Sequence, residues 1–171
     1  ETEETLKKTF RGVTAMHPEG CRIYPLLVIE GTKLADWYRK GCYTPLDLAE
    51  TVRRCAYLYE GLTAAGIPVI RMGLQPDEDL RAPGRILAGP FHPSFGELVH
   101  SYVWQKKIDA LIAEQKSGNY NMVITVPDRL SSIVRGQHRS NIRHWEASGR
   151  IKVQVEAGCQ FEVTFHDQKM V

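Results

Sequence analysis

The clearest chemical pattern of the chain lies in its last third, where basic side chains gather around a glycine-containing turn. Positions 129–152 hold six Lys or Arg residues and one acid, an excess of five over a net charge of +2 for the whole chain. The basic residues are Arg129, Arg135, Arg139, Arg143, Arg150 and Lys152, and the acid is Glu146. The turn at 136–139 leads into a helix that Ser140 can cap. Free backbone N–H groups at such a helix start attract anions, so the pattern predicts phosphate binding.

Residues 133–142 resemble the signature of the KH fold, in which a Gly-x-x-Gly loop between two helices clamps the backbone of single-stranded RNA. Gly136 matches the first glycine, and Ser140, Asn141 and Ile142 match the helix that follows. Arg139 stands in place of the second glycine, so its side chain could bind phosphate instead, or the loop could be a relic. The alternative is a small α/β wing with a few solvated arginines. The RNA-binding candidates are Arg135, Gly136, Gln137, His138, Arg139, Ser140, Asn141 and Arg143.

The front half resembles another family through several separated motifs in a fixed order. The matching segments are residues 22–34, 41–45, 69–76, 88–93 and 96–98. They are similar to the last barrel segments and the carboxyl-terminal extension of radical S-adenosylmethionine (SAM) proteins. Their pattern is that of bacterial proteins similar to the Elongator catalytic subunit, which modifies tRNA wobble uridines. This resemblance implies a parent enzyme that carries a [4Fe–4S] cluster and SAM.

The cluster motif itself is not in the sequence. Radical SAM enzymes bind their cluster through Cys-x-x-x-Cys-x-x-Cys, whereas Cys21, Cys42, Cys55 and Cys159 lie far apart. Without a Cys-x-x-Cys pair, a structural zinc site is also not expected. We therefore expect no cofactor and no metal in this chain, and no activity from the chain alone. Its opening without an initiator Met suggests a piece of a longer protein, whose other barrel half would then be a partner.

Two residues of the front half end the first apolar run at a place where barrel enzymes hold their active sites. Tyr24 and Pro25 could line a cofactor or substrate pocket there, or they could be ordinary packing residues. His92 lies in a Gly-Pro-Phe-His-Pro segment. It could carry protons near neutral pH, or form a rigid turn that caps the sheet.

Arg71 and Gln75 flank the end of the next apolar strand and are further pocket candidates. A charge inside an apolar strand needs a partner, because burying it alone is costly. Arg71 could therefore contact a substrate carboxylate, or form an internal salt bridge with Glu30 or the acidic triplet 77–79.

The elements that would position these residues follow from the spacing of apolar side chains. Helices are expected at 3–16, 32–40 and 46–65, and strands at 22–29 and 67–72, with a loop at 73–93. Pro25 lies inside the first of these strands, so we expect that strand to end or bend there. Leu48, Val52, Cys55, Tyr59 and Leu62 form the clearest helical stripe of the chain. We expect Trp37, Tyr38, Tyr57 and Tyr59 in the core, and Cys21 and Cys42 as buried small side chains.

The tail has the order β-α-α-β-β, from alternating apolar residues at 121–126, 151–155 and 161–165 and two short helices between the first two strands. The fold class is therefore α/β. We expect the last elements of an incomplete (β/α) barrel and its extension at 1–93, a connecting helix at 94–118, and a small α+β KH-like domain at 119–171.

These observations favour a fragment of a cytoplasmic radical SAM enzyme that acts on RNA, with tRNA as the expected partner. The alternatives are a non-catalytic RNA-binding module, or an Elongator-type acetyltransferase or porphyrinogen-oxidase-like oxidoreductase reached through the same resemblance. No apolar run is long enough for a membrane span, so no membrane partner is expected. The two short strands of residues 1–72 are too few for an independent sheet. We therefore expect their open edge to pair with missing strands, to be covered by a helix, or to form a homodimer.

Overall fold

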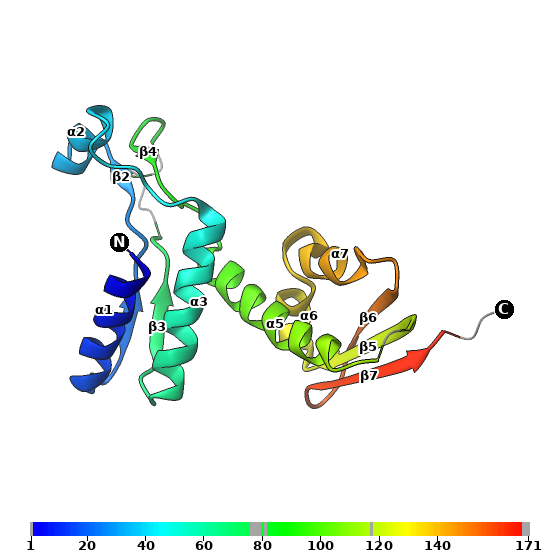
Figure 1. The fold of residues 1–171 in the computed structure, drawn as a ribbon. Helices are drawn as coiled ribbons and strands as arrows, with labels where there is room; N and C mark the ends of the chain where they lie inside the picture. The colour runs from blue at the N-terminus through cyan, green and yellow to red at the C-terminus, as the bar shows by residue number, and fades with distance from the viewer. Residues whose placement is uncertain (1, 76–79, 81, 117, 169–171) are drawn as a thin grey trace. The chain divides into compact units, whose positions relative to one another are not determined.

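The computed structural model describes residues 2–75, 80, 82–116 and 118–168. The chain divides into two compact units, a front unit of residues 1–99 and a tail unit of residues 100–171. The boundary falls inside a long helix, α5 (Phe95–Ala113). Both units combine helices with small sheets, which confirms a mixed α/β composition (Figure 1).

The front unit contains helices α1 (Glu3–Ala15), α2 (Lys33–Arg39) and α3 (Leu48–Ala64). Its strands are β1 (Cys21–Ile23), β2 (Val28–Ile29), β3 (Val69–Met72) and β4 (Ile86–Ala88). Strand β1 pairs with β3 in parallel, and β2 pairs with β4 antiparallel. The apolar run at 22–29 breaks around Pro25 into β1 and β2, which confirms that the strand ends or bends at this proline. The loop expected at 73–93 contains the short strand β4.

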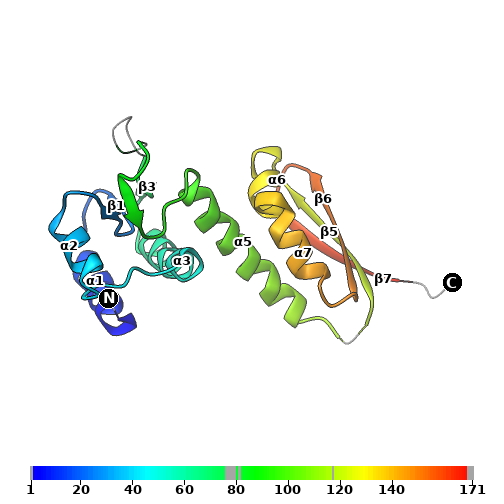
Figure 2. The ribbon, with the colours of Figure 1, turned by 90° about the horizontal axis from the view of Figure 1, so that it is seen from above.

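Helices α1 and α3 of the front unit pack against each other beside β1 and β3 (Figures 1 and 2). The rings of Phe10 and Tyr57 meet edge to face with centroids 5.7 Å apart. Gly61 permits this approach, because a Cβ at that position would lie 2.7 Å from the Phe10 ring. By contrast, Ile70 on β3 is 64% exposed, so this two-stranded sheet keeps an uncovered apolar residue. That residues 1–93 form the last part of an incomplete (β/α) barrel stays a prediction.

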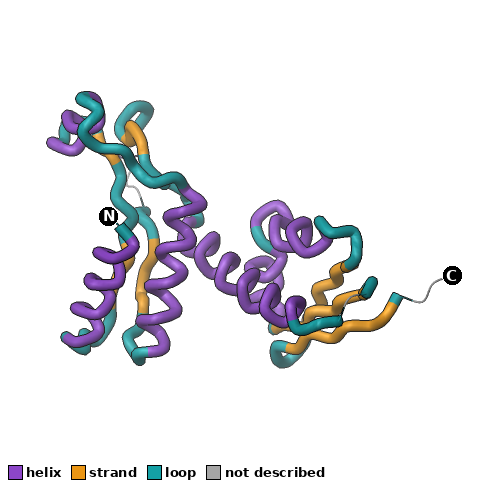
Figure 3. Tube along the Cα trace, viewed as in Figure 1, coloured by secondary structure: helices purple, strands orange, loops and turns teal. Residues whose placement is uncertain are grey.

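The tail unit has the predicted order, and its helices pack on a three-stranded sheet (Figure 3). Its elements after α5 are β5 (Tyr120–Val126), α6 (Asp128–Arg135), the 3₁₀ turn η1 (Gln137–Arg139), α7 (Ser140–Glu146), β6 (Ile151–Ala157) and β7 (Glu162–Asp167). The strand order is β6-β5-β7, with β6 parallel and β7 antiparallel to the central β5. Met122, Ile124 and Val126 of β5 are fully buried against Ile108 of α5 and Trp145 of α7.

Several expected core residues lie at the surface. Trp37, Tyr38 and Tyr57 are 46%, 38% and 38% exposed, so their assignment to the core is wrong. Trp37 and Tyr38 belong to α2, a seven-residue helix in which only Ala35 is buried. So short a helix has little buried surface on which to pack two aromatic side chains. Cys42 is also exposed, while Cys55 is buried. None of the helices in the described ranges is long and apolar enough to cross a membrane.

Candidate functional site

The turn between α6 and α7 is built around Gly136, as the sequence predicted. Gly136 ends α6 with a φ of 73°, and its N–H donates to the carbonyls of Ser132 and Ile133 at 3.0 and 3.2 Å. A Cβ at this position would lie 2.3 Å from Ser140 Oγ and 3.0 Å from the Asn141 nitrogen. Only glycine fits this turn without a shift of its neighbours.

The two residues after Gln137 adopt the left-handed backbone conformation that glycine prefers. His138 has a φ of 51° and Arg139 a φ of 61°. For side-chain-bearing residues this conformation costs roughly 1–2 kcal/mol each. The Arg139 N–H donates to the Gly136 carbonyl at 2.9 Å, which closes the turn. Gln137, His138 and Arg139 are all exposed, so the turn presents a cationic and a titratable side chain to solvent.

Asn141 has an internal role in the structure. Its side chain is 3% exposed, and Nδ2 lies 3.0 Å from the Ser101 carbonyl, from Ser101 Oγ and from the Val134 carbonyl. These contacts join α7 to α5 and to the end of α6. The amide of Asn141 is therefore directed into the core, whereas neighbouring Ser140 is exposed.

Three arginines of the front unit form ion pairs with carboxylates. In the front unit, Arg39 pairs with Glu30 and Arg53 pairs with Glu3 and Glu50. Among the residues that the structure describes, no carboxylate lies within 4.0 Å of any of the six basic side chains of 129–152. All six residues are exposed to solvent.

These six side chains do not form one cluster. Arg139 and Arg143 are one helical turn apart at the start of α7, and Arg135 ends α6 across the turn. The Arg135 Nη2 group donates to the Val155 carbonyl at 2.9 Å, so part of this guanidinium is already engaged. Arg150 and Lys152 lie beyond the other end of α7, at the start of β6.

In the front unit, Tyr24 and Pro25 line a cavity of about 260 Å³ at the end of β1. The remaining lining is mostly apolar, with Arg54 and Thr51 of α3 as polar members. Arg54 Nε donates to Glu50 at 2.6 Å. Hydrogen bonds from Arg53 and then Arg54 lower the pKa of Glu50 to about 2. Arg54 and Glu50 were not predicted as site residues, although their i, i+4 spacing on a predicted helix indicates an ion pair.

His92 lies next to Pro25 in a second, much smaller hollow. Its Nδ1 accepts a hydrogen bond from the Ser94 N–H at 3.1 Å, and its carbonyl accepts one from the Phe95 N–H at 3.2 Å. Both contacts organise the first turn of α5. The structure thus brings Tyr24, Pro25 and His92 into one region and gives His92 a part in a turn.

Arg71 and Gln75 line neither cavity, and both are exposed. The premise that Arg71 carries a buried charge is wrong, because the register sets Arg71 beside Arg22 on an exposed part of the β1–β3 pair. The suggested salt bridge with Glu30 is also wrong, because the partner of Glu30 is Arg39. The acidic triplet 77–79 lies outside the described residues.

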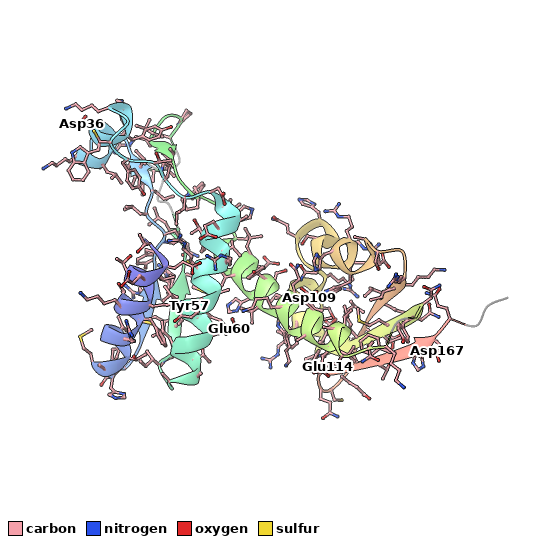
Figure 4. The ribbon with its side chains drawn as sticks, in the orientation of Figure 1. Asp36, Tyr57, Glu60, Asp109, Glu114 and Asp167 are labelled. Carbon is pink, nitrogen blue, oxygen red and sulfur yellow. The ribbon has the colours of Figure 1, made fainter. Side chains whose placement is uncertain are left out.

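Asp109 on α5 is a structural residue that no sequence pattern indicated. Its carboxylate accepts a hydrogen bond from Trp145 Nε1 at 3.0 Å and lies 3.1 Å from His144 Nε2. Figure 4 labels Asp109 on the helix that runs past α7. Because Asp109 and Trp145 are thirty-six positions apart, their hydrogen bond leaves no local pattern in the sequence.

The side chains of this chain do not fit an iron–sulfur cluster. In the described ranges, no group of three or more His, Cys, Asp or Glu side chains is arranged to hold a metal ion. Cys42 and Cys159 are exposed on different units, and Cys55 is buried in α3.

Comparison with known families gives one match. Residues 18–105 match the family model described as the Radical_SAM C-terminal domain. The matched segment includes Tyr24, Pro25, Arg71, Gln75 and His92, and it ends within α5. No curated protein and no solved structure matches the chain.

Proposed function

Because the chain belongs to the Radical_SAM C-terminal domain family, we propose that it is the carboxyl-terminal part of a radical SAM enzyme that acts on RNA. The family implies a parent with an iron–sulfur cluster and SAM. In this proposal the front unit completes the wall of the parent's barrel, and the tail unit holds the RNA. The Elongator-like motifs of the front half favour tRNA as the RNA.

The observation that carries the RNA proposal is the exposed positive charge around the α6–α7 turn. Arg139 and Arg143 project from exposed positions without a carboxylate partner among the described residues. Exposed cations that are left unpaired suit phosphate, because each contact releases a counterion from the nucleic acid. The β-α-α-β order and the tight Gly136 turn support the KH-like interpretation.

The left-handed backbone of Arg139 refines this interpretation. A glycine-type conformation is kept at the position of the second KH glycine, although the residue is arginine. An unfavourable backbone that persists often marks a functional site. We therefore assign phosphate contact to the Arg139 guanidinium rather than to close backbone approach.

The test is fluorescence anisotropy of the full chain with a labelled tRNA and an unstructured oligonucleotide, at several salt concentrations. Arg139→Ala should flatten the plot of log affinity against log salt by about 0.7 and weaken both RNAs alike. Arg139→Gly should behave like Arg139→Ala, because both lose the guanidinium. The matched control Lys8→Ala changes an exposed basic residue of α1 and should leave the slope unchanged.

Two results would overturn this assignment at different levels. If Arg139→Gly holds or raises affinity while Arg139→Ala lowers it, the backbone rather than the side chain contacts phosphate. If neither RNA binds at low salt, the tail is a structural wing and the RNA proposal is wrong. The same holds if both Arg139 variants bind RNA with the affinity and salt dependence of the unmodified chain.

A non-catalytic RNA-binding module is the second candidate, and the widely separated cysteines favour it. The upstream reading frame distinguishes the two candidates. A Cys-x-x-x-Cys-x-x-Cys motif within the preceding barrel half supports the enzyme, and a frame without it supports the module.

A further inference from the structure

The two outer strands of the tail sheet, β6 and β7, differ in whether side chains bond to their outward backbone groups. Tyr120 N–H donates to the Arg150 carbonyl and Gly158 N–H to the Val126 carbonyl, so the even-numbered residues of β6 bond to β5. Val153 and Val155 therefore direct their backbone groups outward. The Val153 N–H donates to Glu146 Oε1 at 2.9 Å, and the Val155 carbonyl accepts from Arg135 Nη2 at 2.9 Å. These two side chains occupy two of the outward hydrogen-bonding positions that another strand would use.

The outer edge of β7 has no such cover. The Gln168 N–H donates to the Asn119 carbonyl, and the register continues this pair to Asn121↔His166 and Val123↔Thr164. Because hydrogen-bonded pairs alternate in an antiparallel ladder, Val163 and Phe165 direct their N–H and C=O groups away from β5. In the part of the chain that the structure describes, no side chain or strand bonds these outward groups. An open edge beside a guarded one indicates that β7 is free to pair.

We propose that β7 pairs antiparallel with β7 of a second copy of this chain, about a twofold axis at Thr164. In this register Val163 forms a hydrogen-bonded pair with Phe165 of the other copy. Both residues suit such a pair, because their backbone N–H and C=O groups point away from β5. It also sets Glu162 opposite His166, which pairs an acid with a basic side chain on the open face of the sheet. The result is a continuous six-stranded sheet with an isologous interface.

The sequence of β7 favours this register over a shift by one residue. A shift by one residue would oppose Val163 to His166 and mix the apolar and polar faces of the two strands. It would also set Glu162 against Asp167, two like charges. Since the strand is complementary to itself in the twofold register, a second copy is the occupant it fits. This edge is distinct from the β1–β3 edge of the front unit.

Disulfide trapping tests the register directly. In the proposed pair Thr164 faces Thr164 with Cβ atoms roughly 4.5–5.5 Å apart, close enough for a disulfide after a small adjustment. In a Cys42→Ser, Cys159→Ser background, Thr164→Cys should give a reducible dimer of twice 19.4 kDa under mild oxidation. The matched control Gln154→Cys, on the same sheet face but on the guarded strand, should stay monomeric. Equal cross-linking of both variants, or none of Thr164→Cys, would overturn the proposal.

Sedimentation velocity over a range of protein concentrations tests the association without cross-linking. The unmodified chain should shift from monomer to dimer as its concentration rises. Thr164→Lys and Thr164→Glu should each remain monomeric, because like charges then meet on the axis, and their equimolar mixture should regain the dimer. Circular dichroism checks that each variant is folded. A chain that stays monomeric at every concentration, or a mixture that does not recover association, would show that β7 does not pair with itself.

Discussion

The side-chain amide of Asn141 reaches back forty residues and donates to both the backbone carbonyl and the hydroxyl of Ser101, each at 3.0 Å. The same nitrogen lies 3.0 Å from the Val134 carbonyl. One buried amide, two residues after the turn at 136–139, thus holds α7 against α5 and against the end of α6. The geometry of the proposed RNA contact therefore depends on hydrogen bonds made by a buried side chain.

Asn141→Ala should destabilise the tail unit by about 2–4 kcal/mol, because it leaves buried acceptors without a donor. Ser101→Ala removes only the hydroxyl acceptor and should cost about 1 kcal/mol. Urea unfolding monitored by the fluorescence of Trp104 and Trp145 measures both changes. Equal effects of the two substitutions would contradict the central role of Asn141.

Gly136→Ala should destabilise the α6–α7 turn more than a positive φ alone explains. The added Cβ would meet Ser140 Oγ at 2.3 Å and the Asn141 nitrogen at 3.0 Å. Gly149 has a φ of 69° but no atom within 4 Å of a built Cβ, so Gly149→Ala is the matched control. We expect about 1 kcal/mol for Gly149→Ala and at least about 2 kcal/mol for Gly136→Ala in urea unfolding. Similar values would show that the turn adjusts to a side chain.

Arg139→Gly should stabilise the tail unit by about 1 kcal/mol even though it weakens RNA binding. Arg139 has a φ of 61°, a conformation that glycine adopts without cost. The control Arg143→Gly lies within α7 and should destabilise by about 1 kcal/mol, because glycine is a poor helix residue. Thermal unfolding of both variants should therefore shift in opposite directions. A loss of stability in Arg139→Gly would mean that its side chain makes stabilising contacts.

The sequence was most informative where one element buries one continuous face. The stripe from Leu48 to Leu62 predicted α3, and the alternation of Met122, Ile124 and Val126 predicted β5, because both patterns reflect a single buried side. The short strands β2 and β4 left no such pattern, since two or three residues do not establish a period.

The site residues were harder to predict, because their surroundings depend on distant segments. Arg71 looked like a buried charge in an apolar strand, yet its side chain is exposed and its register partner across the sheet is Arg22. Asn141 looked like part of an RNA loop, and only the packing of α5 shows that its amide points inward. The glycine requirement at Gly136 could be predicted, because it arises within the turn itself.

Iron reconstitution of this chain should give no stable [4Fe–4S] spectrum. Cys42 and Cys159 are exposed on separate units and Cys55 is buried, so the chain offers no loop of three neighbouring thiolates. The measurement is absorbance at about 400 nm after anaerobic incubation with iron and sulfide, followed by desalting. A cluster absorbance that survives desalting, and that is lost in Cys42→Ser or Cys159→Ser, would contradict this expectation.

Acid should remove the stabilisation that Glu50 gives to the start of α3 through its pairs with Arg53 and Arg54. Hydrogen bonds from Arg53 and then Arg54 lower the pKa of Glu50 from an ordinary 4.5 to about 2. A carboxyl whose folded pKa is depressed contributes stability above its unfolded pKa and loses it as pH falls toward the folded one. The contribution of Glu50 should therefore be complete above pH 4.5 and disappear toward pH 2.

Carboxyl-carbon NMR of Glu50 tests this directly. Arg53→Gln should raise its titration midpoint toward 4.5 more than Arg54→Gln does, because the Arg53 hydrogen bonds are the larger cause. Arg53 also bonds Glu3 on α1, so its loss should loosen the two helices as well. Glu50→Gln should flatten the decline of stability between pH 4.5 and 2, because its amide does not titrate. A midpoint near 4.5 in the unmodified chain would show that Arg53 and Arg54 do not hydrogen-bond to Glu50 when the protein is in solution.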